Sequence, residues 1–319
     1  MALIGKDISK AIEILQSGRL VAIPTETVYG LAGNALDPEA IARIYETKNR
    51  PSFDPLIVHI SGINELAKYV DEIPDKAGLL AERFWPGPLT LLLPKAEIIP
   101  DMVTSGMSTV AIRVPDNKLT LGLLEKLPFP LVAPSANPFG YISPTTASHV
   151  NDQLGERIDY ILDGGACHVG LESTIIGFPE GRPTIYRLGG LTIDNIREVI
   201  GEVDIRPHSS SNPRAPGMLK SHYAPRLPFR LFPENSMQRQ KLPKGAAALV
   251  FQNPPAGINA LHLRILAPDG DLHTAAKNLF RFMRELDNMD ADVICAEEVP
   301  DTGIGKAIND RLRRAAAGE

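Results

Sequence analysis

The chain has 319 residues, a formal net charge of −5 and 44% hydrophobic residues, which indicate a globular protein long enough for two domains. No apolar run approaches about 18 residues, and residues 1–10 carry no basic segment followed by an apolar one. The sequence therefore predicts neither a membrane-spanning helix nor a secretory signal. Cys167 and Cys295 form no CxxC pair and no disulfide framework, which favours a cytoplasmic location. The acidic balance argues against coating of nucleic acid through bulk charge and leaves a local basic groove open.

Residues 8–200 alternate between helical and strand patterns. Apolar side chains repeat with a helical period over residues 8–15, and a second helix over residues 37–47 has Asp37 as its cap and Pro38 as its first residue. Between them a short apolar strand over residues 20–23 stops at Pro24, and no further strand is predicted before Pro38. Helices are also predicted over residues 74–84, 119–126 and 192–200 and from near Thr145, and strands over residues 56–60, 89–93, 109–114, 131–133, 160–162, 173–177 and 184–188.

The amino-acid composition changes over residues 206–228, which hold five prolines and three consecutive serines and are typical of a linker. Beyond it the α/β alternation resumes, with strands predicted over residues 229–232, 247–251 and 293–296 and helices over residues 272–286 and 305–316. This stretch is long enough for a small second α/β domain.

The familiar nucleotide and hydrolase motifs are absent from the sequence. There is no GxxxxGK[ST], GxGxxG after a strand, HExxH, GxSxG or Cys/His metal spacing, and the glycines around Lys306 are too few for a P-loop. If the protein binds a nucleotide, it must do so through a site that uses none of these motifs.

The run from Pro24 to Leu31 joins hydroxyl residues to a tyrosine and a glycine directly after a strand. One interpretation is a strand-to-helix turn with a buried tyrosine. The other is a hydroxyl-lined pocket floor at a strand end, where ligands of open α/β sheets bind.

Lys48 and Arg50 follow the second helix, and Pro51 fixes the chain after them. Such a pair is typical of a solvated helix end, yet a rigidly placed arginine suits bidentate recognition of phosphate or carboxylate. His59 lies on an apolar strand and is interpreted first as a core histidine, with a pocket role as the alternative. Arg113 shares a strand face with Thr109, and it must reach an edge or meet an anion because an unpaired buried charge is costly.

Ser135, Asn137 and Ser143 lie in a turn-rich loop before a helix N-terminus, a place that either only caps the helix or binds phosphate. Glu172 follows two glycines, and the choice between a structural and a metal-binding role stays open. Cys167 is predicted to be buried rather than nucleophilic. Tyr223 lies in the linker, either packed on one domain or closing over a pocket as a lid.

Taken in order, these runs resemble the threonylcarbamoyl-AMP synthase family, which has the YrdC-like fold. The runs are PTETVYGL, KNRP with PLIVHI, FWPGPLTL, TVAIRVP, PSAN with SPT, and LESTI, and they cover about residues 8–200. The PGM and HYAP runs over residues 216–225 resemble the linker of the long, two-domain form.

The resemblance implies a fold class of α/β, with a YrdC-like twisted mixed sheet and helices followed by a smaller Rossmann-like α/β domain. The implied division is a catalytic domain over residues 1–203, a linker or lid over residues 204–228 and a small C-terminal domain over residues 229–319. The role of that last domain is not implied.

The implied reaction converts L-threonine, bicarbonate or CO2, and ATP into threonylcarbamoyl-AMP and pyrophosphate, with Mg²⁺ expected alongside ATP. The adenylate would then pass to a separate transferase complex that modifies tRNA to threonylcarbamoyladenosine beside the anticodon. A direct contact with tRNA or double-stranded RNA stays open, and no membrane partner and no side-chain metal site are expected.

The resemblance also assigns site residues. Lys48, Arg50 and Arg113 would be catalytic, with Lys48 and Arg50 on the phosphates and Arg113 on the threonine carboxylate. Threonine would be held by Thr27, His59, Arg113, Ala133 and Ser173, and ATP by Lys48, Arg50, Asp54, Thr109, Ser135, Asn137, Ser143, Arg187 and Tyr223.

The sequence departs from the family pattern in places. Asp54 stands where asparagine is common, and a carboxylate near phosphates is unfavourable unless it faces Mg²⁺ or Arg50. Ser173 and Thr174 are adjacent, so either hydroxyl could face threonine.

Two other functions compete with the synthase. One is an RNA-binding protein of the same fold without synthase activity, which would not require the coherent pocket residues. The other is the carbamoyl-adenylating domain of hydrogenase maturation enzymes, whose zinc-finger cysteines are missing here.

Overall fold

The computed structural model describes residues 1–206, 222–255, 257–259 and 262–317, so most of the predicted linker, residues 207–221, lies outside the described residues. The chain divides into two compact units. Unit 1 comprises residues 1–139, 144–168 and 172–219, and unit 2 comprises residues 140–143, 169–171 and 220–319.

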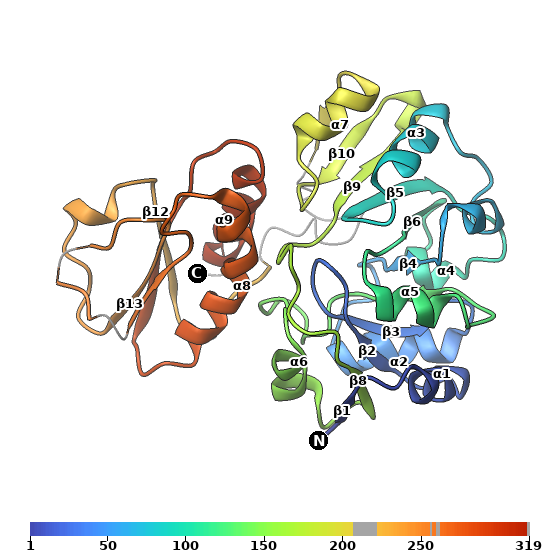
Figure 1. The fold of residues 1–319 in the computed structure, drawn as a ribbon, viewed down its shortest axis with the longest axis horizontal. Helices are drawn as coiled ribbons and strands as arrows, with labels where there is room; N and C mark the ends of the chain where they lie inside the picture. Colours follow the sequence, from blue (N-terminus) through green and yellow to red (C-terminus); the bar gives the residue numbers. More distant parts are fainter. Residues whose placement is uncertain (207–221, 256, 260–261, 318–319) are drawn as a thin grey trace. The chain divides into compact units, whose positions relative to one another are not determined.

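Unit 1 is built on one mixed sheet in the order β1-β8-β2-β3-β7-β4-β6-β5-β9-β10-β11. Its described strands are β1 (Leu3–Gly5), β2 (Val21–Ile23), β3 (Gly30–Asn34), β4 (Ile57–His59), β5 (Leu89–Pro94), β6 (Thr109–Arg113), β7 (Leu131–Val132), β8 (Tyr160–Leu162), β9 (Thr174–Gly177), β10 (Thr184–Arg187) and β11 (Asp204–Ile205). Its helices are α1 (Ile8–Gln16), α2 (Pro38–Lys48), α3 (Asp75–Phe84), α4 (Asp101–Thr104), α5 (Lys118–Leu124), α6 (Ala147–Leu154) and α7 (Ile193–Ile200), with 3₁₀ turns at Ile63–Lys68 and Pro179–Gly181. Figure 1 shows α3 and α7 side by side next to β5, β9 and β10. The predicted mixed α/β fold is confirmed.

Local chemistry explains why helix α2 begins and ends where the sequence predicted. The Asp37 side chain accepts a hydrogen bond of 2.9 Å from the backbone N–H of Glu39, and Pro38 takes the first helical position, where it costs no hydrogen bond. Asn49 closes the helix in the left-handed conformation, with φ 52°. Lys48 is therefore the last residue of the helix.

Strand β3 is a correction to the sequence analysis, which predicted no strand between residues 23 and 38. Gly30–Asn34 pairs antiparallel with β2 and with β7 in the middle of the sheet. A Cβ on Gly30 would lie 3.0 Å from the Ala133 Cβ, and one on Gly33 would lie 3.0 Å from a Leu20 methyl. Neighbouring side chains approach both positions closely, which favours glycine, and glycine weakens the usual strand signal. Strands β1, β11 and β14 were also missed.

The two faces of the central strands carry different side chains. One face, with Val58, Leu91, Ile112 and Ile176, packs into the main core together with helices α2, α3, α6 and α7. The other face carries a small apolar cluster of Ile57, Leu92, Ala111, Ile175 and Tyr186. Because strand side chains alternate, the polar residues two positions along these strands lie on this second face. It is called the open face below.

Unit 2 contains a separate parallel sheet in the order β12-β15-β13-β14. Its described elements are β12 (Phe229–Phe232), β13 (Ala246–Val250), β14 (Leu263–Ile265), α8 (Leu272–Asp287), β15 (Val293–Glu297) and α9 (Gly305–Ala316), with a 3₁₀ turn at Met237–Arg239. Helices α8 and α9 pack on one another and on these strands. Asp271 caps α8 by accepting from the N–H groups of His273 and Thr274.

Candidate active site

The candidate site lies where the polar ends of β4, β6, β5 and β9 meet on the open face. His59 pairs in register with Arg113 across β4 and β6. Thr90 is paired with Ile175 across β5 and β9, and its hydroxyl lies 2.7 Å from the hydroxyl of Ser173, two residues before Ile175. Four chain segments that are distant in sequence thus contribute one polar side chain each to the same edge of the apolar cluster.

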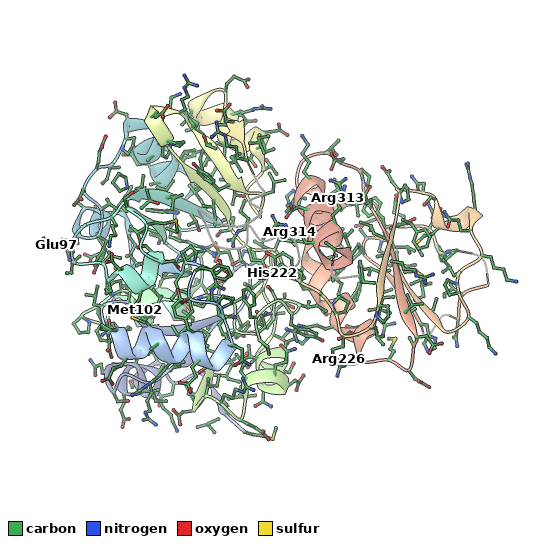
Figure 2. The ribbon with its side chains drawn as sticks, turned by 180° about the vertical axis from the view of Figure 1, so that it is seen from behind. Glu97, Met102, His222, Arg226, Arg313 and Arg314 are labelled. Carbon is green, nitrogen blue, oxygen red and sulfur yellow. The ribbon has the colours of Figure 1, made fainter. Side chains whose placement is uncertain are left out.

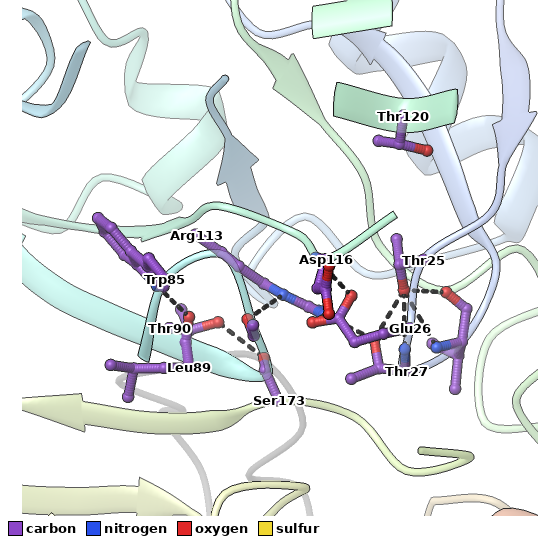
Figure 3. Close-up of polar contacts among 12 residues, drawn as sticks. Thr25, Glu26, Thr27, Trp85, Leu89, Thr90, Arg113, Asp116, Thr120 and Ser173 are labelled. Carbon is purple, nitrogen blue, oxygen red and sulfur yellow. Dashed lines mark hydrogen bonds and ion pairs between the residues drawn. The ribbon is translucent and has the colours of Figure 1, made fainter. Parts of the chain in front are cut away.

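Arg113 is the centre of the site and is only 4% exposed. Its Nη2 lies 2.5 Å from Glu26 Oε1 and donates to Thr27 Oγ1 at 2.9 Å, while Nε donates to the Gly87 carbonyl at 3.4 Å (Figure 3). Within the described part of the chain, Nη1 makes no hydrogen bond. The sequence predicted that Arg113 reaches an edge or meets an anion, and in the structure the anion is the Glu26 carboxylate.

The run from Pro24 to Leu31 contains the buried tyrosine that the first interpretation expected, but it joins β2 to β3 and not a strand to a helix. Thr25 Oγ1 donates to the Val28 carbonyl at 2.6 Å and lies 2.8 Å from Thr27 Oγ1, so the hydroxyls form a fixed turn next to Arg113 (Figure 3). Tyr29 is buried, its hydroxyl donates to the Gly165 carbonyl at 2.8 Å, and burial raises its pKa. The turn holds its hydroxyls rigidly, as a binding site requires.

His59 is a buried, neutral histidine. Burial, reinforced by the Arg113 charge, lowers its pKa to about 3. Its Nδ1 lies 3.2 Å from the Ile57 carbonyl, and this contact assigns the proton to Nδ1, which leaves Nε2 as a hydrogen-bond acceptor. The core interpretation is correct in that the ring is buried and one of its nitrogens is hydrogen-bonded.

Ser173 and Thr174 have different surroundings. The Ser173 hydroxyl lies 2.7 Å from Thr90 Oγ1 and accepts from Arg187 Nη2 at 3.0 Å, whereas the Thr174 hydroxyl donates to the Leu191 carbonyl. Adjacent strand residues point to opposite faces, so Ser173 is the one on the open face. Arg187 also donates from Nε to the Ser173 carbonyl at 3.0 Å, which holds this arginine against β9.

Lys48 and Arg50 are both buried, contrary to the solvated helix end that such pairs usually form. Lys48 Nζ donates to the carbonyls of Ser135 and Asn137, and burial is the main cause that lowers its pKa well below the ordinary value. Arg50 Nη2 lies 2.9 Å from Asp54 Oδ2. The Asp54 carboxylate therefore faces Arg50, which is one of the two arrangements expected to make it tolerable.

The remaining predicted residues lie in three places. Ser135 is half-buried and bridges to Gly30, and Ala133 is buried beside it. Thr109 begins β6, at the opposite end of that strand from Arg113, and lines a cavity of about 640 Å³ with Leu92 and Tyr186. Ser143 and Tyr223 are buried residues of unit 2. Tyr223 stacks on Phe280 with ring centroids 5.4 Å apart, and the Arg311 guanidinium lies 5.1 Å from its ring.

The sequence analysis missed Glu26 and Thr90 as site residues. Glu26 is 1% exposed and also accepts from the backbone N–H of Asp116 at 3.1 Å. Its signal was available, since it is the carboxylate inside the run that carries the hydroxyls. Thr90 interrupts an apolar strand, and a lone polar residue there could have been paired with Ser173 only by knowing the strand order.

No metal centre and no membrane span are present in the described residues. No three His, Cys, Asp or Glu side chains converge there as metal ligands. Among the described helices none is both long and apolar enough to cross a bilayer.

The described geometry defines an α/β protein with a buried, paired arginine and several hydroxyl groups gathered on the open face of a mixed sheet. Comparison with known proteins specifies it further. The family model Sua5/YciO/YrdC, described as telomere recombination, matches residues 13–189, and the model of the threonylcarbamoyl-AMP synthase C-terminal domain matches residues 191–317. The chain belongs to the threonylcarbamoyl-AMP synthase family in its two-domain form, so the resemblance is confirmed.

Two relatives and one solved structure resemble the chain over almost its full length. A threonylcarbamoyl-AMP synthase of Pyrococcus abyssi is 42% identical over 96% of this chain and 93% of its own. One of Bacillus subtilis is 41% identical over 98% of this chain and 93% of its own. The crystal structure of P. abyssi Sua5 complexed with L-threonine, 39% identical, superposes with a TM-score of 0.91 over 99% of this chain and 97% of that one.

Proposed function

We propose that the open face of unit 1 binds L-threonine and ATP and joins them through a carbamate, releasing pyrophosphate. The observation that carries the proposal is Arg113: it is buried and fixed by Glu26 and Thr27, and it retains an Nη1 without a hydrogen bond among the described residues. A fixed guanidinium beside hydroxyl groups matches an amino-acid carboxylate.

Arg113 would bind the carboxylate of threonine. The other residues proposed to hold threonine are Thr27, His59, Ala133 and Ser173. The neutral His59 presents Nε2 as an acceptor, which suits a hydroxyl or ammonium donor of the amino acid. The Ser173 hydroxyl is oriented by Thr90 and Arg187.

ATP would extend from this point over the same face. Lys48 and Arg50 would meet the phosphates, and the other nucleotide contacts would come from Asp54, Thr109, Ser135, Asn137, Ser143, Arg187 and Tyr223. The buried Lys48 supports the proposal in a second way, because it bonds the carbonyls of Ser135 and Asn137 and so positions both residues. Tyr223 would close the nucleotide site as part of the linker.

The chemistry requires no side-chain nucleophile. The threonine amine adds to CO2 and loses a proton, an oxygen of the resulting carbamate attacks the α-phosphorus, and the bond to the β-phosphate breaks with its electron pair leaving on pyrophosphate. The protein's part is to orient the reactants and to stabilise the charge at phosphorus. Mg²⁺ would arrive with ATP, held by phosphate oxygens and water.

The adenylate would then be consumed by a separate transferase complex acting on tRNA. A protein of this fold that only binds RNA would use neither the Arg113–Glu26 pair nor the hydroxyls around it. That rival function is decided by the same experiment as the synthase.

The test is pyrophosphate release from ATP, measured with and without L-threonine and bicarbonate, with mass detection of threonylcarbamoyl-AMP. Release that requires both substrates is expected. Arg113→Ala should abolish it, while Arg83→Ala, an exposed arginine on α3, should not change it. ATP hydrolysis indifferent to threonine, or no turnover by the unmodified protein, would contradict the proposal and favour RNA binding.

A further inference from the structure

Two short segments of the N-terminal part of the sequence pack within unit 2. They are Gly140–Ser143 and Val169–Leu171, and they group with residues 220–319 rather than with their sequence neighbours. The first segment contains Ser143, a predicted site residue. The second directly precedes Glu172 and Ser173. The contacts that hold these segments come from helix α8.

Asp287, the last residue of α8, binds the first segment and the end of the linker. It is 3% exposed. Its Oδ2 accepts from the Tyr141 hydroxyl at 2.5 Å, and its Oδ1 accepts from the backbone N–H groups of Arg226 and Leu227 at 2.8 and 2.9 Å. Arg226, labelled in Figure 2, adds a contact from Nε to Oδ2 at 3.1 Å. One carboxylate therefore ties together three parts of the chain.

Arg284, one turn earlier on α8, holds the backbone of the same segment. It is 5% exposed, and its Nη2 and Nε donate to the carbonyls of Ile142 and Ser143, the second at 3.3 Å. Its guanidinium lies 5.1 Å from the Tyr141 ring. A planar guanidinium can make both carbonyl contacts and the ring contact together, whereas an ammonium at the same place cannot.

The residues that flank this segment, Phe139 and Pro144, belong to unit 1 and form hydrogen bonds there. The N–H of Phe139 donates to the Lys48 carbonyl at 2.8 Å, and the N–H of Tyr29 donates to the Pro144 carbonyl at 2.9 Å. Between these anchors, Arg284 of α8 holds the backbone of Ile142 and Ser143, and the carbonyl of Gly140 accepts from the N–H of Ala224 at 2.9 Å. The conformation of Ser143 thus depends on residues more than a hundred positions away, as the Arg284–Ser143 separation of 141 shows.

The second segment meets α8 by close packing. Gly170 has φ +79°, and a Cβ there would lie 2.5 Å from the Lys277 Cα and 2.6 Å from the Ala276 carbonyl oxygen. Only glycine allows this approach. Helix α8 therefore contacts both segments independently.

We propose that Arg284 and Asp287 are positioning residues of the nucleotide site, acting through the backbone of Ile142 and Ser143 and through Tyr141. This gives the C-terminal unit a task in the reaction. It rests on the proposed function insofar as Ser143 binds ATP. Neither residue is catalytic, because each acts on the segment and not on substrate.

The test compares Arg284→Lys, Asp287→Asn and Tyr141→Phe with the unmodified protein. Binding of a non-hydrolysable ATP analogue is titrated calorimetrically, and KM is measured separately for ATP and L-threonine. Each variant should weaken the analogue and raise the KM for ATP by about tenfold, with the KM for threonine changed less than about twofold. The matched control is Arg281→Lys, an exposed arginine of the same helix whose Nη2 donates to Asn278 Oδ1, and it should change neither KM.

Analogue affinity unchanged in Arg284→Lys and Tyr141→Phe would overturn the inference. Equal losses for ATP and threonine, tracking a fall in Tm, would also overturn it, since they indicate a merely structural role. Failure of the proposed function is distinguishable, because the unmodified protein would then bind the analogue without threonine-dependent release of pyrophosphate.

Discussion

The Arg113–Glu26 pair makes a quantitative prediction about Glu26→Gln. The substitution keeps the size of the side chain and removes its charge. Arg113 would then remain buried, with the Thr27 hydroxyl and the Gly87 carbonyl as its other described partners. Both are neutral, so a buried cation would lose its compensating anion.

The size of the effect follows from the burial of both partners, at 4% for Arg113 and 1% for Glu26. Removing one member of a buried ion pair costs about 3–5 kcal/mol, and the retained amide oxygen favours the lower end. For a domain of this size about 1 kcal/mol corresponds to roughly 2–4 °C in Tm, so a decrease of about 6–12 °C is expected. Glu65→Gln is the matched control, because the Glu65–Lys68 pair is exposed and worth at most about 1 kcal/mol.

The assay is thermal unfolding with and without saturating L-threonine. If the threonine carboxylate binds Arg113, it restores the missing anion, so threonine should raise the Tm of Glu26→Gln by more than it raises that of the unmodified protein. A Tm within about 1 °C of the unmodified protein would refute the energetic role assigned to the pair. An equal threonine shift in both proteins would refute Arg113 as the carboxylate anchor.

Three further predictions follow from the same site. Arg113→Ala should remove threonine-dependent turnover and leave binding of an ATP analogue within about threefold, and an equal loss of both in titrations would show that the arginine does not serve threonine alone. The pKa of His59 is about 3 in the folded protein and about 6.5 in the unfolded chain. Between these values only the unfolded chain takes up a proton. The free energy of unfolding should therefore fall on acidification below pH 6.5, by up to about 1.4 kcal/mol per pH unit. Denaturant titrations at pH 4.5–6.5 should give a shallower slope for His59→Gln and an unchanged one for exposed His168→Gln, and equal slopes would mean that His59 titrates normally. Ser173→Ala should raise the KM for threonine by about tenfold, whereas Thr174→Ala should chiefly lower Tm through the lost bond to Leu191, and the reverse pattern would assign threonine binding to Thr174.

Local signals were sufficient for most elements of the fold. Helix α2 follows from an aspartate cap, a proline at the first position and regular apolar spacing, and all three are visible in the sequence. Strand β3 was not predictable in this way, because its glycines are required by the approach of Ala133 and Leu20, which come from other elements. A strand defined by what its neighbours need carries little signal of its own.

The candidate site likewise has features that local sequence predicts and features that depend on distant elements. That Arg113 must reach an edge or meet an anion followed from the cost of burying a charge. That it meets an anion, and that the anion is Glu26, depends on how β6 and the turn after β2 meet in space. Lys48 shows the same limit. A lysine at a helix end is normally solvated, and its burial here depends on the Ser135 and Asn137 carbonyls of a distant loop.

The proposed site would bind a carboxylate and a phosphate with cations that are, in two cases, already paired within the protein. Arg113 and Arg50 are each compensated by a buried carboxylate from the protein, so their positions are set before substrate arrives. Lys48 differs, since both of its described partners are neutral carbonyls and burial lowers its pKa. A phosphate placed beside Lys48 would add to the favourable effect of the nearby Asp54 charge and so favour the charged ammonium. Recognition of threonine would then depend on the geometry of a paired arginine, and recognition of ATP on completing the charge balance of a buried lysine.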